Sequence, residues 1–375
     1  MRLFFASLPI LALTAGACTD DAGPSQEPAS KLELSMTATI PAAAEVEYCQ
    51  FVTVPETWVT KDAIDFTAGS HHVLVYQTPY KSVPTKTDDG RPVDTSGVFD
   101  CSDGPTNGWS VTKLVGGSQN QSGESMLAFP EGVGARVGGV LLMNVHYRNG
   151  SDAPLTTDVK VTFDTATADQ ISQEGDILFL FNPLIGVKPG GTARSHWSCP
   201  VYQDITIANV QSHMHSRGVG YEARVDGAAP FYVNDRWEGV PVKAFDNFTV
   251  KAGSKLDYYC DFRNTSGTPV YMGPRTTDEM CMLIGSYYPA DPRTANCLDA
   301  SGSVPGGEWI GQGTASCAQT LSCIQQASGL PGITDCMLAA SPTVSRETSE
   351  LASCFFGARN PVADCGPQIQ ACTAR

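Results

Sequence analysis

The sequence predicts an all-β protein with two consecutive antiparallel β-sandwich domains of the jelly-roll type, followed by a small disulfide-rich helical domain. Three observations lead to this prediction. Short segments rich in Val, Tyr, Phe and Thr alternate with turn signals, among 36 Gly and 25 Pro residues. Helical periodicity is nearly absent before residue 300. Six of the 13 cysteines lie after residue 316.

The first residues of the chain predict export. Arg2 supplies a positive start, and residues 3–13 form an apolar stretch too short to span the roughly 30 Å hydrocarbon core of a bilayer. Residues 15–18 are small and end in a cysteine, as at a cleavage site. This pattern resembles the lipobox of a bacterial lipoprotein.

That resemblance implies a signal peptide at residues 1–17 and a lipid on Cys18, the first residue of the mature chain. Residues 18–33 are rich in small and polar residues and predict a flexible linker. Thr19 favours the outer membrane or cell surface as the destination. The alternative is an ordinary secreted protein that is cleaved nearby. No other segment is apolar and long enough to cross a membrane, so we expect contact with the membrane only through the anchor.

The composition bounds the partners and the redox state of the protein. The net charge of −15 would repel a phosphate backbone, which argues against nucleic acid as a partner. With Cys18 set aside, twelve cysteines remain, an even number that indicates disulfides in an exported protein.

The predicted strands are too numerous for one sandwich of ordinary size. We therefore expect an N-terminal sandwich at residues 34–168 and a second sandwich at 169–300, with the boundary in a polar stretch at 165–175. Examples of the predicted strands are residues 47–54, 72–76, 140–147, 159–163 and 177–181.

Residues 301–375 differ in character from the strands before them. They contain stretches that suit short helices and six cysteines: Cys317, Cys323, Cys336, Cys354, Cys365 and Cys372. So small a unit usually needs covalent crosslinks, each worth about 2–4 kcal/mol. Three disulfides would serve, and six cysteines allow fifteen connectivities. A zinc site is the alternative, disfavoured because no Cys-x-x-Cys pair occurs here.

Five of the six histidines fall into patterns that suggest metal binding. His213 and His215 are separated by two positions in a strand-like segment, so their side chains would share one sheet face and could hold one ion. Met214 would then face the opposite way. Imidazole suits copper and zinc, and the thioether of Met280 would favour copper. The alternatives are a polar strand edge and ordinary core packing of the methionine.

His71 and His72 are adjacent, so both can reach one metal only where the strand ends or kinks. The preceding residues 68–70 include a glycine and offer such a place. His146 lies in a run apolar enough for a central strand, where its ring needs a partner. It could complete a three-histidine site, or it could be a buried structural histidine.

The motifs occur in an order that resembles the copper type II, ascorbate-dependent monooxygenases. This family includes peptidylglycine α-hydroxylating monooxygenase and dopamine β-monooxygenase. The resemblance covers roughly residues 35–300. It rests on His71-His72, a Phe-Pro-Glu-Gly-Val-Gly-Ala-Arg-Val-Gly-Gly segment from Phe129, Val145-His146-Tyr147, His213-Met214-His215, and Asp278-Glu279-Met280-Cys281 with Tyr287-Tyr288-Pro289.

The resemblance implies two coppers per chain. His71, His72 and His146 would hold an electron-transfer copper, whereas His213, His215 and Met280 would hold the oxygen-activating, catalytic copper. It also implies the disulfides Cys49–Cys101, Cys199–Cys297 and Cys260–Cys281. Ascorbate, or another one-electron reductant, would reduce both coppers, and one atom of O2 would enter a C–H bond of the substrate.

The substrate is an organic molecule that the sequence does not identify. The peptide-amidating members hold a carboxylate through an arginine, an asparagine and a tyrosine, whose positions correspond here to Gln211, Met282 and Ile284. A carboxylate buried without those partners would be costly, which argues against peptidylglycine. Met282 and Ile284 suggest a more apolar pocket, although they could simply pack the strand.

Two further functions stay open at this point. The chain could be a copper-binding or copper-delivery surface lipoprotein without turnover. It could also be a surface interaction module, in which the cysteine-rich tail contacts a protein or the cell wall.

Overall fold

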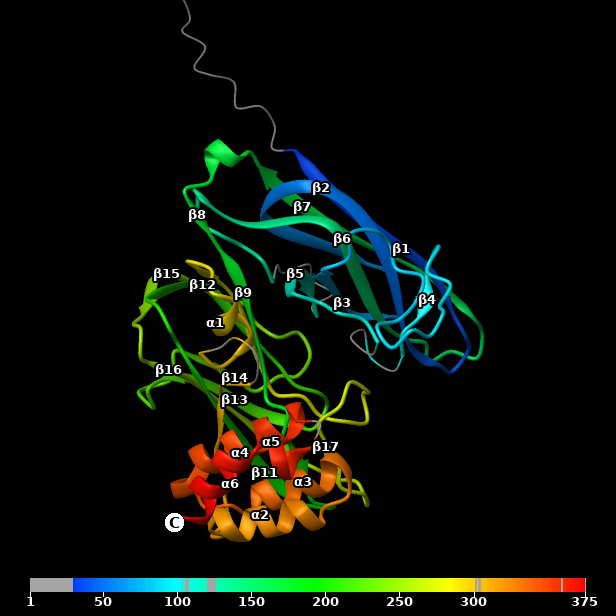
Figure 1. The fold of residues 1–375 in the computed structure, drawn as a ribbon. Coiled ribbons are helices and arrows are strands. Elements are labelled where there is room, and N and C mark those ends of the chain that lie inside the picture. Colours follow the sequence, from blue (N-terminus) through cyan, green and yellow to red (C-terminus); the bar gives the residue numbers. More distant parts are fainter. Residues whose placement is uncertain are drawn as a thin grey trace, which may run out of the picture.

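The computed structural model describes residues 30–374 except 103, 105–107, 120–125, 301, 303–304 and 359. Two β-sandwiches follow one another along the chain, and a group of short helices packs against the second (Figure 1). The predicted fold class is thereby confirmed. The predicted signal peptide and the lipid-modified Cys18 lie outside the described residues. Within the described part, no helix is both long and apolar enough to cross a membrane.

The first sandwich is a single eight-stranded sheet that turns back over itself. The strands follow the order β1-β7-β2-β6-β3-β5, with β4 paired to β2 and β8 to β6. Their bounds are β1 (Lys31–Ile40), β2 (Glu45–Phe66), β3 (Ser70–Gln77), β4 (Phe99–Asp100), β5 (Lys113–Ser118), β6 (Val133–Arg148), β7 (Leu155–Ala166) and β8 (Gln173–Glu174). A short 3-10 turn, η1 (Ala168–Gln170), precedes β8. The sheet thus extends past the predicted boundary at residue 168.

The length of β2 explains how one sheet makes two layers. Its first part pairs with β6 and its last part with β7, with a register shift between Val54 and Thr57. In β1, exposed and buried residues alternate, as expected of a strand with one face on a core. Gly116 of β5 faces β7 so closely that a Cβ there would lie 2.5 Å from a ring carbon of Phe163. The missing side chain lets the two layers meet.

The second sandwich consists of two separate sheets. One has the order β14-β13-β16-β11-β19 and the other β15-β12-β18-β9, beside a small β10-β17 pair. Their bounds are β9 (Asp176–Phe181), β10 (Gly186–Val187), β11 (Thr192–Pro200), β12 (Ile205–His213), β13 (Gly218–Val225), β14 (Tyr232–Asn234), β15 (Lys243–Val250), β16 (Lys255–Arg263), β17 (Val270–Tyr271), β18 (Met282–Tyr288) and β19 (Glu308–Trp309). Buried residues of both sheets share one apolar core.

The helices after β19 pack on the second sandwich. They are α2 (Cys317–Gln326), α3 (Gly329–Leu338), α4 (Ser345–Gly357), α5 (Pro361–Asp364) and α6 (Gly366–Thr373), with a 3-10 turn η2 (Pro342–Val344). Ile324, Met337 and Ala352 belong to the same buried cluster as the sandwich core. Trp309 of β19 is buried and pairs with Trp197 of β11. The tail therefore completes this core (Figure 1).

Six disulfides crosslink the part of the chain that the structure describes. Three join the pairs that the family resemblance implied, Cys49–Cys101, Cys199–Cys297 and Cys260–Cys281. The tail cysteines pair as Cys317–Cys372, Cys323–Cys336 and Cys354–Cys365. The second of the three core disulfides fastens β11 to the end of the short helix α1 (Pro292–Asn296).

Candidate metal centre

The three histidines of the first sandwich meet across two neighbouring strands. His72 of β3 lies opposite His146 of β6, and the register of this pair shifts between Ser70 and His72. Gly69 before it has φ +91°, a conformation that suits glycine. The predicted kink is thus present, and it brings the His71 ring to the same place as the His72 ring.

The rings of this first set are close enough for one ion. The ring centroids of His71, His72 and His146 lie 5.4, 5.2 and 5.0 Å apart. One nitrogen from each ring can be chosen so that all three lie within 4.8 Å of one another. Three imidazoles in this arrangement can coordinate a single copper or zinc ion.

The hydrogen bonding leaves the inner nitrogens of this set free. His146 Nε2 lies 3.0 Å from Glu45 Oε1, and because an ionised carboxylate only accepts, the ring proton sits on Nε2. The Nδ1 atoms of His72 and His146 are buried and have no hydrogen-bond partner among the described residues. Buried ring nitrogens without a partner are unusual, and a metal ion would satisfy both. These residues fit a bound ion.

Burial also keeps the first set in the metal-binding protonation state. It lowers the pKa of His146 to about 4 and the pKa of His72 well below its usual value, with the neighbouring histidines adding to the effect. Burial lowers the pKa of His71 as well. At neutral pH the rings are therefore uncharged, with lone pairs available for a metal.

The second set lies where β12 ends. His213 is the last residue of β12, so His215 stands beyond the strand in a turn that the Gly218 N–H closes onto the His215 carbonyl. The strand is therefore shorter than expected, and the turn brings the two ring centroids to 5.2 Å. Met214 faces the opposite way, as expected, and is buried in the second core.

Hydrogen bonds fix the ring orientation of the second set. His215 Nδ1 lies 3.0 Å from the Asp278 carbonyl oxygen, which can only accept, so this nitrogen carries the proton. His213 Nδ1 contacts Gln119 Oε1 in the same way. The Gln119 amide donates to the Ser212 carbonyl at 2.5 Å, which sets its orientation. Both rings thus keep Nε2 for a metal, the arrangement in which a neighbouring acceptor fixes the tautomer of a ligand.

Met280 reaches the same cavity as His213. The segment that carries it is held by Glu279, whose buried carboxylate accepts from the backbone N–H groups of His215 at 3.0 Å and Arg217 at 2.8 Å. Burial raises the pKa of Glu279 to about 7, although those hydrogen bonds oppose the shift. The Cys260–Cys281 disulfide ties the residue after Met280 to β16.

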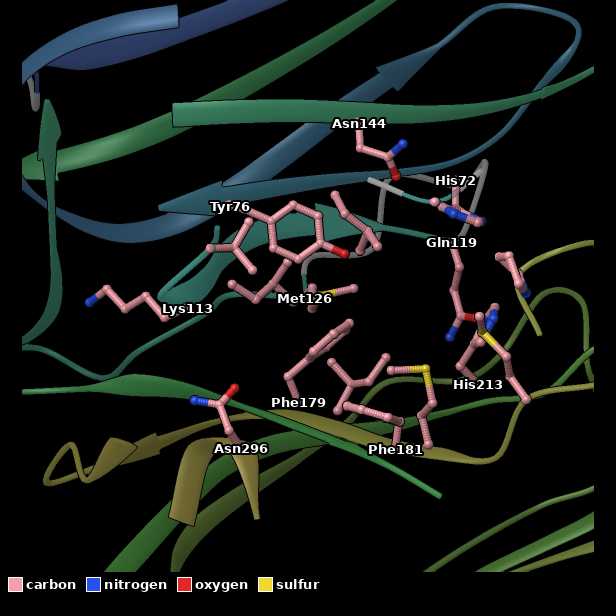
Figure 2. A pocket seen from close by; sticks show the side chains of 18 of the residues that line it. His72, Tyr76, Lys113, Gln119, Met126, Asn144, Phe179, Phe181, His213 and Asn296 are labelled. Atoms are coloured by element: carbon pink, nitrogen blue, oxygen red, sulfur yellow. The ribbon is translucent and has the colours of Figure 1, made fainter. Parts of the chain in front are cut away.

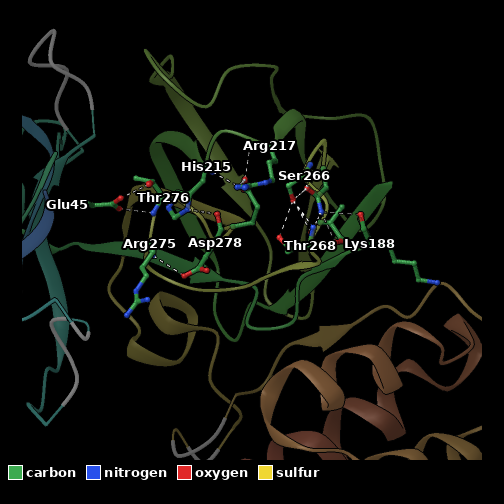
Figure 3. A network of polar contacts seen from close by, with 12 residues as sticks. Glu45, Lys188, His215, Arg217, Ser266, Thr268, Arg275, Thr276 and Asp278 are labelled. Carbon is green, nitrogen blue, oxygen red and sulfur yellow. Dashed lines mark hydrogen bonds and ion pairs between the residues drawn. The ribbon is translucent and has the colours of Figure 1, made fainter. Parts of the chain in front are cut away.

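The two histidine sets lie side by side across the interface between the sandwiches. The ring centroids of His72 and His213 are 6.0 Å apart. Glu45, which holds His146, also accepts from the backbone N–H and the hydroxyl of Thr276, at 2.9 and 2.6 Å. Figure 3 shows this contact beside His215 and Asp278. The five histidines therefore form one continuous cluster that involves both domains.

A cavity of about 630 Å³ opens beside this cluster. In Figure 2, Tyr76, Asn144 and His72 line the wall from the first sandwich, and Phe179, Phe181 and His213 line the opposite wall. Met282 and Ile284 also line the cavity, which supports the expectation of an apolar pocket at these positions. Gln211, unlike these two residues, does not line the cavity. It is buried, and its side-chain oxygen accepts from Gln119 at 3.2 Å.

Several residues of the site carried no signal in the sequence. Glu45, Gln119 and the Asp278 carbonyl became visible only through contacts between segments distant along the chain. The two-residue spacing of Glu45, Glu47 and Cys49 along β2 is visible in the sequence. The pairing of β2 with β6, which places Glu45 near His146, is not. The sixth histidine, His196, stands apart as expected and pairs with Asp257 at 3.1 Å.

Comparisons with known proteins give little further information. No protein-family model and no curated protein matches the sequence. One similar solved structure is PNGase F, a glycosylasparaginase from Flavobacterium meningosepticum, with 10% identity, a TM-score of 0.34, and coverage of 68% of this chain and 96% of that one. Another is the major capsid protein P2 of bacteriophage PM2, with 10% identity, a TM-score of 0.26, and coverage of 69% and 97%. Likeness at this level carries no functional argument.

Proposed function

We propose that this protein is a copper- and ascorbate-dependent monooxygenase that hydroxylates a C–H bond of an organic substrate with O2. The observation that carries the proposal is the pairing of two unlike ligand sets in one cluster. His71, His72 and His146 offer three imidazoles. His213 and His215 offer two, with the Met280 thioether in the adjoining cavity. A protein that only carried copper would not require two different sets side by side.

The residues of each set suit copper. Imidazole nitrogens bind both oxidation states, and a thioether favours Cu(I). When bound, copper would supply one-electron redox chemistry at each set, so that R–H, O2, two electrons and two protons give R–OH and water. Ascorbate or another one-electron donor would provide the electrons.

The protein's own part in this reaction is positioning. Glu45 accepts from His146 Nε2, so Nδ1 of that ring stays free and is directed inward. The Asp278 carbonyl accepts from His215 Nδ1, so Nε2 of that ring stays free. The contact between His72 and His213 keeps the two sets adjacent, so electrons would cross only a short gap. Apolar side chains line the cavity on the side where Met280 and His213 lie, which disfavours water there.

The first experiment is copper stoichiometry by elemental analysis. The protein lacking residues 1–18 is reconstituted, desalted and compared with His146→Ala, Met280→Leu and His196→Ala. We expect about two coppers per chain, with His146→Ala weakening one site and Met280→Leu the other. Leucine keeps the volume of methionine but removes the sulfur. His196→Ala is the control, a histidine outside the cluster, and should keep both coppers.

Two coppers distributed in this way would lead to a test of ascorbate-dependent oxygen uptake. Electron paramagnetic resonance adds a check on the adjacency of the sets. Fully oxidised protein should show dipolar broadening between two Cu(II) ions, and His146→Ala should abolish it. One copper or none in the unmodified protein would sink the proposal and favour a copper carrier or an interaction module.

We also propose that the protein is exported and anchored through a lipid on Cys18. The lipobox resemblance and twelve cysteines in six disulfides support this, because such disulfides persist in oxidising compartments. Mass spectrometry of the mature protein should find Cys18 at the N-terminus with acyl chains attached. An unmodified N-terminus elsewhere would refute the anchor.

A further inference from the structure

Polar and apolar side chains both line the cavity beside the histidines, and the apolar ones make up most of the exposed wall. Among them are Leu74, Met126, Phe179, Met280, Met282 and Ile284, contributed by both sandwiches. Its volume of about 630 Å³ falls within the roughly 300–1,000 Å³ of pockets that take small organic ligands. His72 and His213 both border it, so a molecule inside would lie directly against the proposed copper cluster.

The cavity offers no cationic side chain near the histidines to balance a negatively charged ligand. Apart from the histidines, the described lining residues with ionisable acidic or basic side chains are Glu47, Lys113 and Tyr76. The Glu47 carboxylate already accepts from Asn144 Nδ2 at 3.0 Å. Lys113 lies at the end of the cavity away from His213 (Figure 2). An anionic group placed between the apolar walls would lose its hydration without compensation.

Besides His72 Nδ1, one more buried polar atom of the lining residues has no partner in the described part of the chain. Asn144 is fully buried, its Nδ2 is engaged by Glu47, and its Oδ1 has no hydrogen-bond partner among the described residues. Asn144 lies two residues before His146 on the same face of β6, and Figure 2 shows it on the same wall as His72. A buried carbonyl oxygen without a donor costs free energy that a ligand O–H or N–H would recover.

We propose that the substrate is a mostly apolar molecule without a negative charge, with one O–H or N–H group that donates to Asn144. This inference rests on the proposed hydroxylase function, since it deepens the same site. The donor would anchor the molecule against the wall of the first sandwich, and the apolar part would extend along Phe179, Met282 and Ile284. The C–H bond to be hydroxylated would then lie on the side facing His213.

The test uses three dyes of one shape, added to the whole purified protein without copper. N-phenyl-1-naphthylamine is neutral and apolar and has one N–H. 8-Anilinonaphthalene-1-sulfonate adds a negative charge, and the N-methyl derivative of the first dye lacks the N–H. Fluorescence titration measures each dissociation constant. We expect the neutral dye to bind at least about tenfold tighter than the sulfonate. It should bind about three- to tenfold tighter than the N-methyl derivative, the range of one hydrogen bond.

A rim substitution locates the bound dye. Phe181 lines the cavity but is 48% exposed, so Phe181→Arg should leave the fold intact. We expect it to weaken binding of the neutral dye and strengthen binding of the sulfonate, each by severalfold. Val233→Arg is the matched control, because Val233 is 64% exposed on β14 and does not line the cavity. It should change neither constant.

Several results would overturn the inference. They are equal or tighter binding of the sulfonate, equal binding of the N-methyl derivative, or insensitivity of the neutral dye to Phe181→Arg. Because the dyes need no copper, these outcomes are separable from the copper measurement. Two coppers with no binding of the neutral dye would reject the substrate class alone. Dye binding with no copper would reject the hydroxylase on which the inference rests.

Discussion

The two histidine sets are held in different ways. The first set belongs to two paired strands of one sheet, and the β3 and β6 register alone brings His72 to His146. The second set depends on separate segments: the end of β12, the loop before β18, and Gln119 from the other sandwich. The first site should therefore survive changes that loosen the loops or the domain interface. The second site should lose its metal before the first site does.

The two sandwiches differ in a parallel way. The first closes by folding one continuous sheet over itself. The second has two sheets whose core is completed by tail residues that lie far along the chain. We expect stability of the second site to be coupled to the tail, and stability of the first site to be largely independent of it.

The largest expected effect comes from the tail. Met337 of α3 is fully buried in the second core, and its truncation in Met337→Ala should cost about 2–5 kcal/mol of unfolding free energy. Met36→Ala in β1 is the matched control, because Met36 is buried in the first core. Denaturant unfolding with copper titration should show that Met337→Ala weakens the second site and Met36→Ala does not. A stability unchanged by Met337→Ala would mean that the tail is accessory.

The disulfide beside Met280 gives the next largest effect. It closes a sequence separation of 21 residues, and the double change Cys260→Ser with Cys281→Ser should cost about 3 kcal/mol. The Met280 segment would also lose its tie to β16, so copper at the second site should weaken while the first site stays loaded. The paired change Cys323→Ser with Cys336→Ser, in the tail, is the comparison. Equal loss at both copper sites would contradict the separation of the two sets.

Asp176 provides a pH test at the domain interface. It is buried in β9, and burial raises its pKa to about 6, opposed by Lys113 of β5. The folded state thus binds this proton more tightly than the unfolded state, whose carboxyl has its ordinary pKa near 4. This group therefore costs stability as pH rises from about 4 to about 6, by roughly 2–3 kcal/mol at about 1.4 kcal/mol per pKa unit.

Asp176→Asn should remove this loss. Its unfolding free energy relative to the unmodified protein should rise between pH 4 and 6 and level off above pH 7. Denaturant melts across this range measure the difference, and a difference independent of pH would contradict the argument. Asp65→Asn, at an exposed position on β2, is the matched control.

The smallest expected effect concerns the support of His215. Glu279→Gln keeps the size of the side chain but replaces one carboxylate oxygen by an N–H₂ group. That donor would face the backbone N–H of His215 or Arg217, and one hydrogen bond would be lost. We expect copper affinity at the second site to fall at least about tenfold, as for other residues that orient metal ligands, with the first site unchanged. Glu45→Gln should do the reverse, because Glu45 orients His146. Competitive copper titration of the two variants provides the measurement.

Some features of the fold could be read from local sequence with little ambiguity. The strand pattern and the cysteine distribution predicted the sandwiches and the helical tail, because burial of one strand face imposes a two-residue period. The glycine before His71 marked the kink, since a positive φ suits glycine. The strand predicted to carry both His213 and His215 ends at His213, a boundary set by turn hydrogen bonds that no period reveals.

The sequence by itself determined which residues could serve as ligands and predicted that they form two unlike sets. Imidazole and thioether chemistry belongs to the side chains wherever they lie. Only the tertiary structure decided that the sets adjoin, which ring nitrogens remain free, and that an apolar cavity with an unpaired Asn144 oxygen lies beside them. These properties arise from contacts between segments tens to hundreds of residues apart. Such contacts depend on how two separate cores pack together, and no local pattern specifies that packing.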